Sequence, residues 1–322
     1  MFDIILSDET KFSCEEHETI IEAALRNDVY LDHSCLTGRC ASCKCQVVKG
    51  NTYTDNEELS LNSLEKEQGY ILTCVRKVKS DICIEAEDLG KYGLTKPQTI
   101  PAKINNIIDL TKDIKQISLR VPPNQKVGFL EGQYVNVLWN GLRRSYSIAS
   151  TSKELEIQLI LKNYPGGKMS QYWFNKCKVE DLLRLEIPKG TFFLRNHTNK
   201  ENLIFLATGT GIAPIKAILE SEKNQVELKK YKRIVLLWGM KNHQDFFWNP
   251  KSNDIEFFPI ASREASPKKY VQNSLLELDI DFSKTVIYAC GNDQMIQTNK
   301  NISIKKGLEA RDFYSDAFVP SN

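Results

Sequence analysis

The first third of the chain alternates between short apolar runs and polar positions. Residues 1–12 alternate with a period of two, which predicts a strand. Apolar residues at helical spacing follow over 18–29, and a second short helical stretch over 55–69 ends at a glycine. Residues 70–78 have the pattern of an extended segment. These elements predict a small α+β module over residues 1–93.

The pattern changes after a Gly- and Pro-containing stretch over 87–103, where six short β-type runs begin. Turn residues separate these runs, which is typical of a small antiparallel barrel. The domain predicted here covers residues 98–198. The six runs, in order, are "KINNIID", "IKQISLRV", "QYVNVLW", "SYSIAS", "LEIQLILK" and "DLLRLEIP".

The remainder, residues 199–322, returns to buried strands that alternate with helical stretches. "NLIFLATGTGIAPIKAILES" over 202–221 has the pattern of strand, glycine turn and helix. Further strands are predicted at 233–240, 255–262 and 285–291. This alternation is what a parallel sheet requires, so we expect a Rossmann-like α/β domain.

Composition places the chain among ordinary globular proteins, with 322 residues, 41% hydrophobic and 26% charged. The N-terminus lacks the basic and apolar regions of a signal peptide, and no apolar run could span a bilayer. We therefore expect a cytoplasmic protein with no membrane contact. In that reducing compartment the nine cysteines favour metal binding over disulfides.

The net charge of +2 indicates no nucleic-acid partner, but the charge is unevenly distributed. Residues 1–93 hold 18 acidic and 10 basic side chains, whereas residues 94–322 hold 23 acidic and 33 basic ones. This asymmetry is either a drift in surface composition or a sign that an acidic module docks on a basic body or partner.

The densest chemistry is "DHSCLTGRCASCKCQVVKG" over 32–50. Cys35, Cys40 and Cys43 have the spacing C-x4-C-x2-C, and Cys74 closes the set after thirty residues. This is the plant-type pattern for a [2Fe–2S] cluster. A structural zinc site is the alternative, although zinc sites favour two separated C-x2-C pairs. Cys45 is predicted to be a small buried side chain.

On these residues the segment 1–93 resembles a plant-type ferredoxin domain, which implies a β-grasp fold. Two weaker signals follow it. "RSYS" over 144–147 puts an arginine and a tyrosine on one side of a strand, and "YPGGKMSQYWFN" over 164–175 brings a Gly-Gly turn to a helix start. Each alone is more often an ordinary surface pattern or turn. A helix N-terminus suits a pyrophosphate.

In this order the two signals resemble the flavin domain of the ferredoxin–NADP reductase superfamily. The resemblance implies that Arg144 meets the FAD phosphates, that Tyr146 stacks on the isoalloxazine, and that Ser147 lies beside flavin N5. It also implies a pyrophosphate site at 167–170. The implied cofactor-binding residues of this domain are Arg144, Ser145, Tyr146, Ser147, Gly167, Lys168, Met169 and Ser170.

"TGTGIAP" over 208–214 and the pair Cys290-Gly291 are similar to the nicotinamide domain of the same superfamily. Glycines allow a ligand to approach the backbone. The resemblance implies that Cys290 faces the nicotinamide and that Asp316 and Phe318 of "FYSDAF" lie near the flavin, although a core cysteine and a flexible tail are the alternatives. The implied nucleotide-binding residues are Thr208, Gly209, Thr210, Gly211, Pro214, Ser262, Arg263, Cys290 and Gly291.

A hydride carries two electrons, whereas a [2Fe–2S] cluster passes one at a time, and a flavin between them connects the two. We therefore predict an oxidoreductase whose electrons go to another protein. The catalytic residues implied by the resemblance are Ser147, Cys290, Asp316 and Phe318.

A finer resemblance, based on "GGKMSQYWFN", "DLLRLEIPKGTFFLR", "IFLATGTGIAPIKA", "YACG" and "FYSDAF", is to the CDP-6-deoxy-3,4-glucoseen reductases. It implies that a pyridoxamine-phosphate-dependent sugar dehydrase accepts the electrons during C3 deoxygenation of a CDP-6-deoxy-4-ketohexose. The alternatives are the reductase component of a multicomponent mono- or dioxygenase and a free flavin reductase. Ser262-Arg263 resembles a 2′-phosphate grip, so NADPH is possible, but the sugar-reductase resemblance implies NADH.

Overall fold

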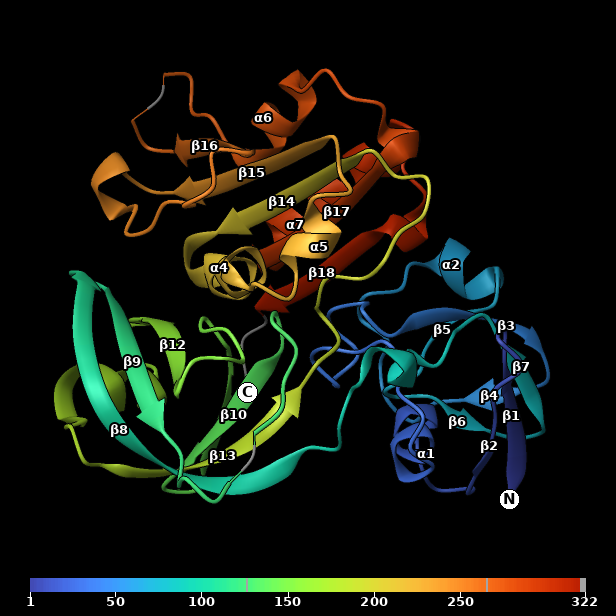
Figure 1. Ribbon diagram of the computed structural model, residues 1–322. Coiled ribbons are helices and arrows are strands. Elements are labelled where there is room, and N and C mark those ends of the chain that lie inside the picture. Colours follow the sequence, from blue (N-terminus) through green and yellow to red (C-terminus); the bar gives the residue numbers. More distant parts are fainter. Residues whose placement is uncertain (126, 265, 319–322) are drawn as a thin grey trace. The chain divides into compact units, whose positions relative to one another are not determined.

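The computed structural model describes residues 1–125, 127–264 and 266–318 of the chain (Figure 1). The chain divides into two compact units, residues 1–96 and 97–322, and each unit has its own hydrophobic core. Among the described residues, no helix combines the length and the apolar character needed to cross a membrane.

Unit 1 is built on a five-stranded sheet in the order β2-β1-β7-β3-β5, beside a two-stranded sheet of β4 and β6. Helix α1 contributes buried side chains to the same core as the sheet. This confirms the predicted β-grasp fold. The elements are β1 (Phe2–Leu6), β2 (Lys11–Cys14), α1 (Ile20–Arg26), β3 (Lys44–Lys49), β4 (Thr52–Tyr53), α2 (Ser63–Glu67), β5 (Tyr70–Leu72), β6 (Lys77–Val78), β7 (Ile82–Ile84) and the 3-10 helix η1 (Leu89–Tyr92).

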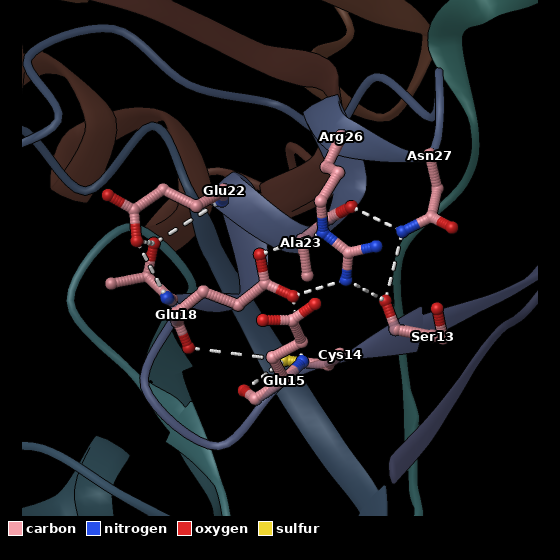
Figure 2. Close-up of polar contacts among 9 residues, drawn as sticks. Ser13, Cys14, Glu15, Glu18, Glu22, Ala23, Arg26 and Asn27 are labelled. Atoms are coloured by element: carbon pink, nitrogen blue, oxygen red, sulfur yellow. Dashed lines mark hydrogen bonds and ion pairs between the residues drawn. The ribbon is translucent and has the colours of Figure 1, made fainter. Parts of the chain in front are cut away.

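A polar network fastens the C-terminal end of α1 to β2 (Figure 2). Arg26 binds the Glu18 carboxylate and donates to the Ser13 carbonyl oxygen at 3.0 Å. The Nδ2 atom of Asn27 donates to the same carbonyl at 2.9 Å. Because these contacts hold the end of the helix, the segment that leads from α1 to Cys35 starts from a fixed point.

The first part of unit 2, which we call the barrel lobe, is a six-stranded antiparallel sheet in the order β11-β10-β13-β8-β9-β12. An antiparallel bridge between Ile148 and Leu159 joins its two edges, so the sheet closes as predicted. All six predicted strands are present. The elements are β8 (Gln98–Thr111), β9 (Ile114–Arg120), β10 (Tyr134–Trp139), β11 (Leu142–Ser147), β12 (Glu156–Lys162), α3 (Lys168–Gln171), the π-helix η2 (Tyr172–Lys176) and β13 (Leu182–Lys189).

The second part of unit 2, the parallel-sheet lobe, has five parallel strands in the order β16-β15-β14-β17-β18. The strand order reverses at β14, and ligands of such sheets bind at the carboxyl edge where the order reverses. The elements are β14 (Asn202–Thr208), η3 (Gly209–Gly211), α4 (Ile212–Glu220), α5 (Gln225–Leu228), β15 (Arg233–Met240), η4 (His243–Asp245), β16 (Ile255–Ala261), α6 (Val271–Glu277), η5 (Phe282–Lys284), β17 (Thr285–Asn292), α7 (Asp293–Lys305), η6 (Ala310–Asp312) and β18 (Phe313–Phe318).

The two lobes of unit 2 share one core cluster, which includes Ala149 and Phe192 from the barrel lobe with Ile215 and Ile218 from α4. Gly132 lies at this contact with φ +108°, and a Cβ atom there would lie 2.2 Å from the Phe192 carbonyl oxygen. Only glycine fits this backbone conformation and this space. The lobes therefore pack tightly enough to hold side chains of both in one site.

One local prediction and one of the alternatives differ from the structure. Cys74 lies in a turn, not in an extended segment, because the amides of Val75 and Arg76 both bind the Leu72 carbonyl oxygen, at 3.0 and 3.1 Å. Residues 313–318, for which a flexible tail was the alternative to a place near the flavin, form strand β18 beside β17. Its last residue, Phe318, is partly buried against the shared core.

Candidate functional site

The four predicted ligand cysteines lie around one loop of unit 1, and their sulfur atoms gather in two pairs. The amide of Cys35 donates to the Sγ atom of Cys40 at 3.4 Å, and the two side chains are also hydrogen-bonded. The Sγ atoms of Cys43 and Cys74 lie 3.2 Å apart. The structure thus brings together all four residues that the spacing selected.

The surroundings of each pair favour one thiolate. The hydrogen bond from the Cys40 side chain lowers the pKa of Cys35 to about 5, and the Thr37 amide, 3.4 Å from the Cys35 sulfur, acts in the same direction. The hydrogen bond from Cys43 lowers the pKa of Cys74. The same hydrogen bonds raise the pKa of Cys40 and of Cys43, so each pair holds one thiolate and one thiol. Metals bind the thiolate and not the thiol, so binding a metal would release the remaining protons.

The backbone of the loop is sharply wound. Leu36, Gly38 and Ala41 all have positive φ, at 57°, 72° and 56°. A Cβ atom on Gly38 would lie 3.0 Å from the Glu57 carbonyl oxygen, so glycine fits best there. The Gly38 amide is hydrogen-bonded to Cys74 and helps to lower its pKa. The winding therefore aims amides at the sulfurs.

Cys45 stands apart from the pairs. It lies in β3 opposite Ile71, is 7% exposed, and has a pKa raised to about 12 by burial. Among the described residues no three His, Cys, Asp or Glu side chains form a site for one metal ion. A tetrahedral zinc ion would need four ligands around one point. In a two-iron cluster each iron takes two thiolates beside the bridging sulfides, so two cysteine pairs fit a [2Fe–2S] core.

In unit 2, Arg144 and Tyr146 are partly buried on one face of β11, as strand alternation predicts. The fully buried Trp173 donates from Nε1 to the Tyr146 hydroxyl at 2.9 Å and meets its ring edge-on, with centroids 6.0 Å apart. Burial raises the pKa of Tyr146 to about 12, so the phenol stays neutral. Trp173 therefore fixes the ring that the resemblance assigns to the flavin.

Ser145 projects from the opposite face of β11. Its hydroxyl donates to the Asn136 side-chain oxygen at 2.7 Å, and Asn136 donates in turn to Glu186 at 2.9 Å. Arg143 on the same face pairs with Glu186. These contacts separate the Arg143–Ser145 face from the face that carries Arg144 and Tyr146.

The Gly-Gly turn over 164–167 leads directly into α3, as predicted. Gly167 occupies the N-cap position, and the buried Ser170 hydroxyl accepts the Tyr164 amide at 3.1 Å. Met169 is buried and Lys168 is exposed. Because η2 follows α3 at once and carries Trp173, this turn and the Tyr146 ring belong to one local assembly.

The glycine loop at the end of β14 closely approaches the end of β17. A Cβ atom on Gly211 would lie 2.3 Å from the Cys290 carbonyl oxygen, and one on Gly291 would lie 2.4 Å from the Thr208 hydroxyl oxygen. That hydroxyl accepts the Asn292 amide at 3.0 Å. Gly209 and Thr210 complete the loop, and Pro214 lies in the first turn of α4, where no amide donor is needed.

Ser147, Cys290 and Asp316 come together where the two lobes meet. Cys290 and Asp316 are direct neighbours in the β17–β18 register. The Ser147 hydroxyl donates to the Asp316 carboxylate at 3.3 Å, although 169 residues separate them in the chain. All three side chains are buried, and burial together with the Asp316 charge raises the pKa of Cys290. Cys290 therefore stays a neutral thiol.

The other predicted residues lie along the same carboxyl edge of the sheet. Ser262 donates to the Met240 carbonyl oxygen at 3.0 Å, which places Ser262 and the exposed Arg263 at the ends of β15 and β16. Phe318 pairs with Asn292 at the ends of β17 and β18. The sheet order separates these two places by β14, the strand that carries the glycine loop.

Sequence reasoning did not single out two residues of this site. Trp173 stands inside a quoted motif, but its contact with Tyr146 crosses 27 residues. Asn292 follows Gly291, and its backbone amide gives no signal in the sequence. Each contact exists only in the folded chain, so the sequence alone could not identify it.

Comparisons with known proteins agree with this geometry. Three family models match: a 2Fe-2S iron-sulfur cluster binding domain over residues 4–79, an oxidoreductase FAD-binding domain over 101–194, and an oxidoreductase NAD-binding domain over 205–301. The predicted cofactor classes are thereby confirmed. Together these domains define an iron–sulfur flavoprotein reductase.

The chain is 35% identical to a CDP-6-deoxy-L-threo-D-glycero-4-hexulose-3-dehydrase reductase from Yersinia pestis, over 96% of both chains. It is 33% identical to protein RfbI of Salmonella typhimurium, over 97% of this chain and 94% of that one. The chain belongs to the family of these dehydrase reductases, as the sequence motifs indicated.

More distant relatives are electron-transfer proteins of another kind. The toluate 1,2-dioxygenase electron transfer component of Pseudomonas putida is 30% identical over 94% of this chain and 93% of its own length. The crystal structure of the Amycolatopsis cytochrome P450 reductase GcoB superposes with a TM-score of 0.74 and 22% identity, covering 99% of both chains. At that identity the structural match confirms the fold alone.

Proposed function

We propose that this chain carries electrons from NADH, through FAD and a [2Fe–2S] cluster, to a pyridoxamine-phosphate-dependent sugar dehydrase. The dehydrase would hold a CDP-6-deoxy-4-ketohexose intermediate whose C3 deoxygenation needs those electrons. When bound, FAD accepts two electrons as a hydride and passes them on singly, and the cluster carries one at a time. The choice of partner is supported by the 35% identity to CDP-6-deoxy-L-threo-D-glycero-4-hexulose-3-dehydrase reductases over almost the whole chain.

In this proposal each residue group has one task. Cys35, Cys40, Cys43 and Cys74 hold the cluster as two pairs. Arg144 pairs with the FAD phosphates, and Tyr146, fixed by Trp173, stacks on the isoalloxazine. Ser145, on the other face of β11, would act only by supporting that strand. The N-terminal amides at Gly167–Ser170 would bind the pyrophosphate.

At the nicotinamide side, the Thr208–Gly211 loop and Gly291 leave the backbone open to a nucleotide. Ser147, Cys290 and Asp316 would align the reacting rings. The neutral Cys290 thiol brings no competing charge to a hydride acceptor. Phe318, at the end of β18, would shield the flavin until nicotinamide displaces it, since an aromatic stack is worth about 1 kcal/mol.

NADH is the proposed donor. Ser262 and Arg263 could grip a 2′-phosphate, but Glu264 follows them and accepts the His243 amide at 2.7 Å. Its carboxylate brings negative charge to the same turn and would oppose a phosphate group. This arrangement supports NADH over NADPH.

The proposal is tested by reconstitution under anaerobic conditions. The purified protein is mixed with NADH, a CDP-hexulose 3-dehydrase loaded with pyridoxamine phosphate, and its 4-ketohexose substrate. We expect NADH oxidation together with a product that has lost the C3 oxygen, detected by mass spectrometry. The matched control is Cys74→Ser, which should keep FAD but give no product.

The second candidate is the reductase component of an oxygenase, favoured by the 30% identity to the toluate dioxygenase component. A parallel reaction with a toluate dioxygenase oxygenase component, toluate and oxygen tests it. Hydroxylated product there, with none from the dehydrase reaction, would replace the first proposal by the second.

A further inference from the structure

Lys216 of helix α4 makes a contact that the site described so far does not use. The helix begins at the glycine loop, and Lys216 points from it to the barrel lobe. Its Nζ atom donates to the Ala149 carbonyl oxygen at 3.1 Å and pairs with Glu220 Oε2 at 2.6 Å. The Lys216 side chain is only 12% exposed. Ala149 lies two residues after Ser147.

Glu220 extends this contact to a third segment. Its other oxygen, Oε1, accepts the indole Nε1–H of Trp248 at 2.9 Å. The Trp248 ring lies 6.5 Å from that of Trp238, centroid to centroid, and Trp238 donates to the Gly209 carbonyl oxygen at 2.9 Å. The network thus runs from the glycine loop, through two tryptophans and the Lys216–Glu220 ion pair, to Ala149, which lies just beyond the end of β11.

Burial makes the Lys216 contact persistent. An ammonium group removed from water must keep its partners, because an unpaired buried charge is strongly destabilising. The receiving segment is also held from the other side, since the Ala149 amide donates to the Gln158 carbonyl oxygen at 2.8 Å and the Ser150 hydroxyl accepts the Gln158 amide at 3.0 Å. Ala149 is therefore fixed between β12 and α4.

We propose that Lys216 is a positioning residue for hydride transfer. It ties the carbonyl oxygen just beyond Ser147 to the helix that begins at the glycine loop. This contact keeps Ser147 within hydrogen-bonding distance of Asp316, next to Cys290. It thereby fixes the position of β11 relative to the ends of β17 and β18, where nicotinamide is proposed to bind. The inference rests on the proposed hydride transfer from NADH to FAD.

The chain offers a matched control. Lys153 and Glu222 form an ion pair between neighbouring segments of the same two lobes, but their side chains are 67% and 78% exposed. Exposed ion pairs contribute little to stability or geometry because water screens them. Replacing Lys153 therefore removes one lysine from the contact between the same two lobes and leaves the buried contacts of Lys216 with Ala149 and Glu220 intact.

The test compares Lys216→Met, Lys216→Arg and Lys153→Met in the full-length, FAD-loaded protein. Anaerobic stopped-flow mixing with NADH gives the limiting rate of FAD reduction and the NADH dissociation constant. We expect the limiting rate of Lys216→Met to fall roughly tenfold to a hundredfold, the size of effect that a small misplacement produces. The dissociation constant should stay unchanged. Lys216→Arg should recover most of the rate, and Lys153→Met should match the wild type.

A second readout does not depend on turnover. Hydrogen–deuterium exchange should quicken at the amides of residues 148–150 in Lys216→Met, with or without FAD, and not in Lys153→Met. If Lys216→Met fails to fold, Glu220→Gln takes its place and should show slower FAD reduction and faster exchange at 148–150.

Wild-type reduction rates and exchange in the substituted protein would overturn the positioning role. Failure of the wild type to accept hydride from NADH would instead overturn the proposed function. In that case the exchange measurement still decides whether Lys216 holds the segment.

Discussion

The cysteine loop of unit 1 and the Ser147–Cys290–Asp316 group of unit 2 are assembled in opposite ways. Three of the four cysteines fall within nine consecutive residues, and the fourth arrives by a local turn. The second group, which we propose acts at the hydride side and call the hydride-side group, draws one residue from each of three strands in two lobes, with a sequence separation of 169 between Ser147 and Asp316. The cysteine site needs only one loop and one turn of the same unit, whereas the Ser147–Cys290–Asp316 group depends on how two lobes pack.

This difference predicts how each site fails. A substitution in the cysteine loop should destroy the cluster outright and leave the flavin chemistry intact. A substitution in the hydride-side group should change rates and affinities by degrees, because backbone packing still holds the remaining partners.

The largest effect is expected for the cluster ligands. Replacing Cys35, Cys40, Cys43 or Cys74 by Ser should abolish the electron paramagnetic resonance signal of the reduced [2Fe–2S] cluster, because one iron then loses one of its two thiolates. FAD reduction by NADH should continue. Cys45→Ser is the control and should keep the signal, since Cys45 lies outside both pairs. A Cys45→Ser protein without its cluster would refute the assignment.

Arg144→Ala should weaken FAD binding by roughly 10- to 150-fold, because a hydrogen bond to a charged group contributes about 1.5–3 kcal/mol. Fluorescence titration of the FAD-free protein measures the dissociation constant. Arg143→Ala is the neighbouring control, as Arg143 pairs with Glu186 on the other face of the strand. Equal losses for the two arginines would contradict the assignment of faces.

Asp316→Asn should slow hydride transfer about tenfold, equivalent to roughly 1.4 kcal/mol of transition-state stabilisation. The asparagine side chain keeps the size of the aspartate but lacks the negative charge of the carboxylate to which the Ser147 hydroxyl donates. Stopped-flow reduction by NADH measures the rate, and the flavin absorbance reports FAD content. An unchanged rate at full FAD content would remove Asp316 from the hydride site.

The effect of Arg263→Ala on the preference between NADH and NADPH should be smaller than the effect of Asp316→Asn on hydride transfer. The wild type is expected to have a higher kcat/KM for NADH than for NADPH, and Arg263→Ala should widen that preference only slightly, because Arg263 is exposed. Steady-state kinetics with ferricyanide as acceptor measure both values. A strong preference for NADPH that Arg263→Ala reverses would show that Ser262-Arg263 binds a 2′-phosphate.

The smallest effect concerns pH and His197, in the segment that joins the two lobes. Burial lowers its pKa from 6.5; the Asp312 and Glu227 charges oppose the shift, and Arg195 and Lys200 add to it. The unfolded chain then binds more protons than the folded one below pH 6.5, so stability should fall as pH falls through that window. The melting temperature of His197→Gln should depend less on pH there. Identical pH profiles would exclude the effect.

The same contrast explains what the sequence could predict. The cysteine spacing was sufficient to select the four residues that the structure brings together in two pairs, because so dense a set of thiols has few alternative uses. The six barrel strands and the first four parallel strands were visible as apolar runs bounded by turns. Strand β18 was not predicted, because its short run at the end of the chain becomes a strand only by pairing with β17.

The hydride-side residues could be named only through family resemblance. Nothing in the residues around Ser147 indicates Asp316 as a partner, since the contact exists only after the lobes pack. Lys216 and Trp248 gave no signal for the same reason. Contacts across lobes are decided by long-range packing, which periodicity and spacing do not encode.

The central claim is that one chain takes a hydride from NADH and delivers single electrons through the cluster. An anaerobic NADH titration of the purified protein, followed by flavin absorbance and electron paramagnetic resonance, tests it most directly. The account predicts bleaching of the flavin together with the signal of a reduced [2Fe–2S] cluster. A bleached flavin without that signal, in protein that contains its full iron and sulfide, would contradict it.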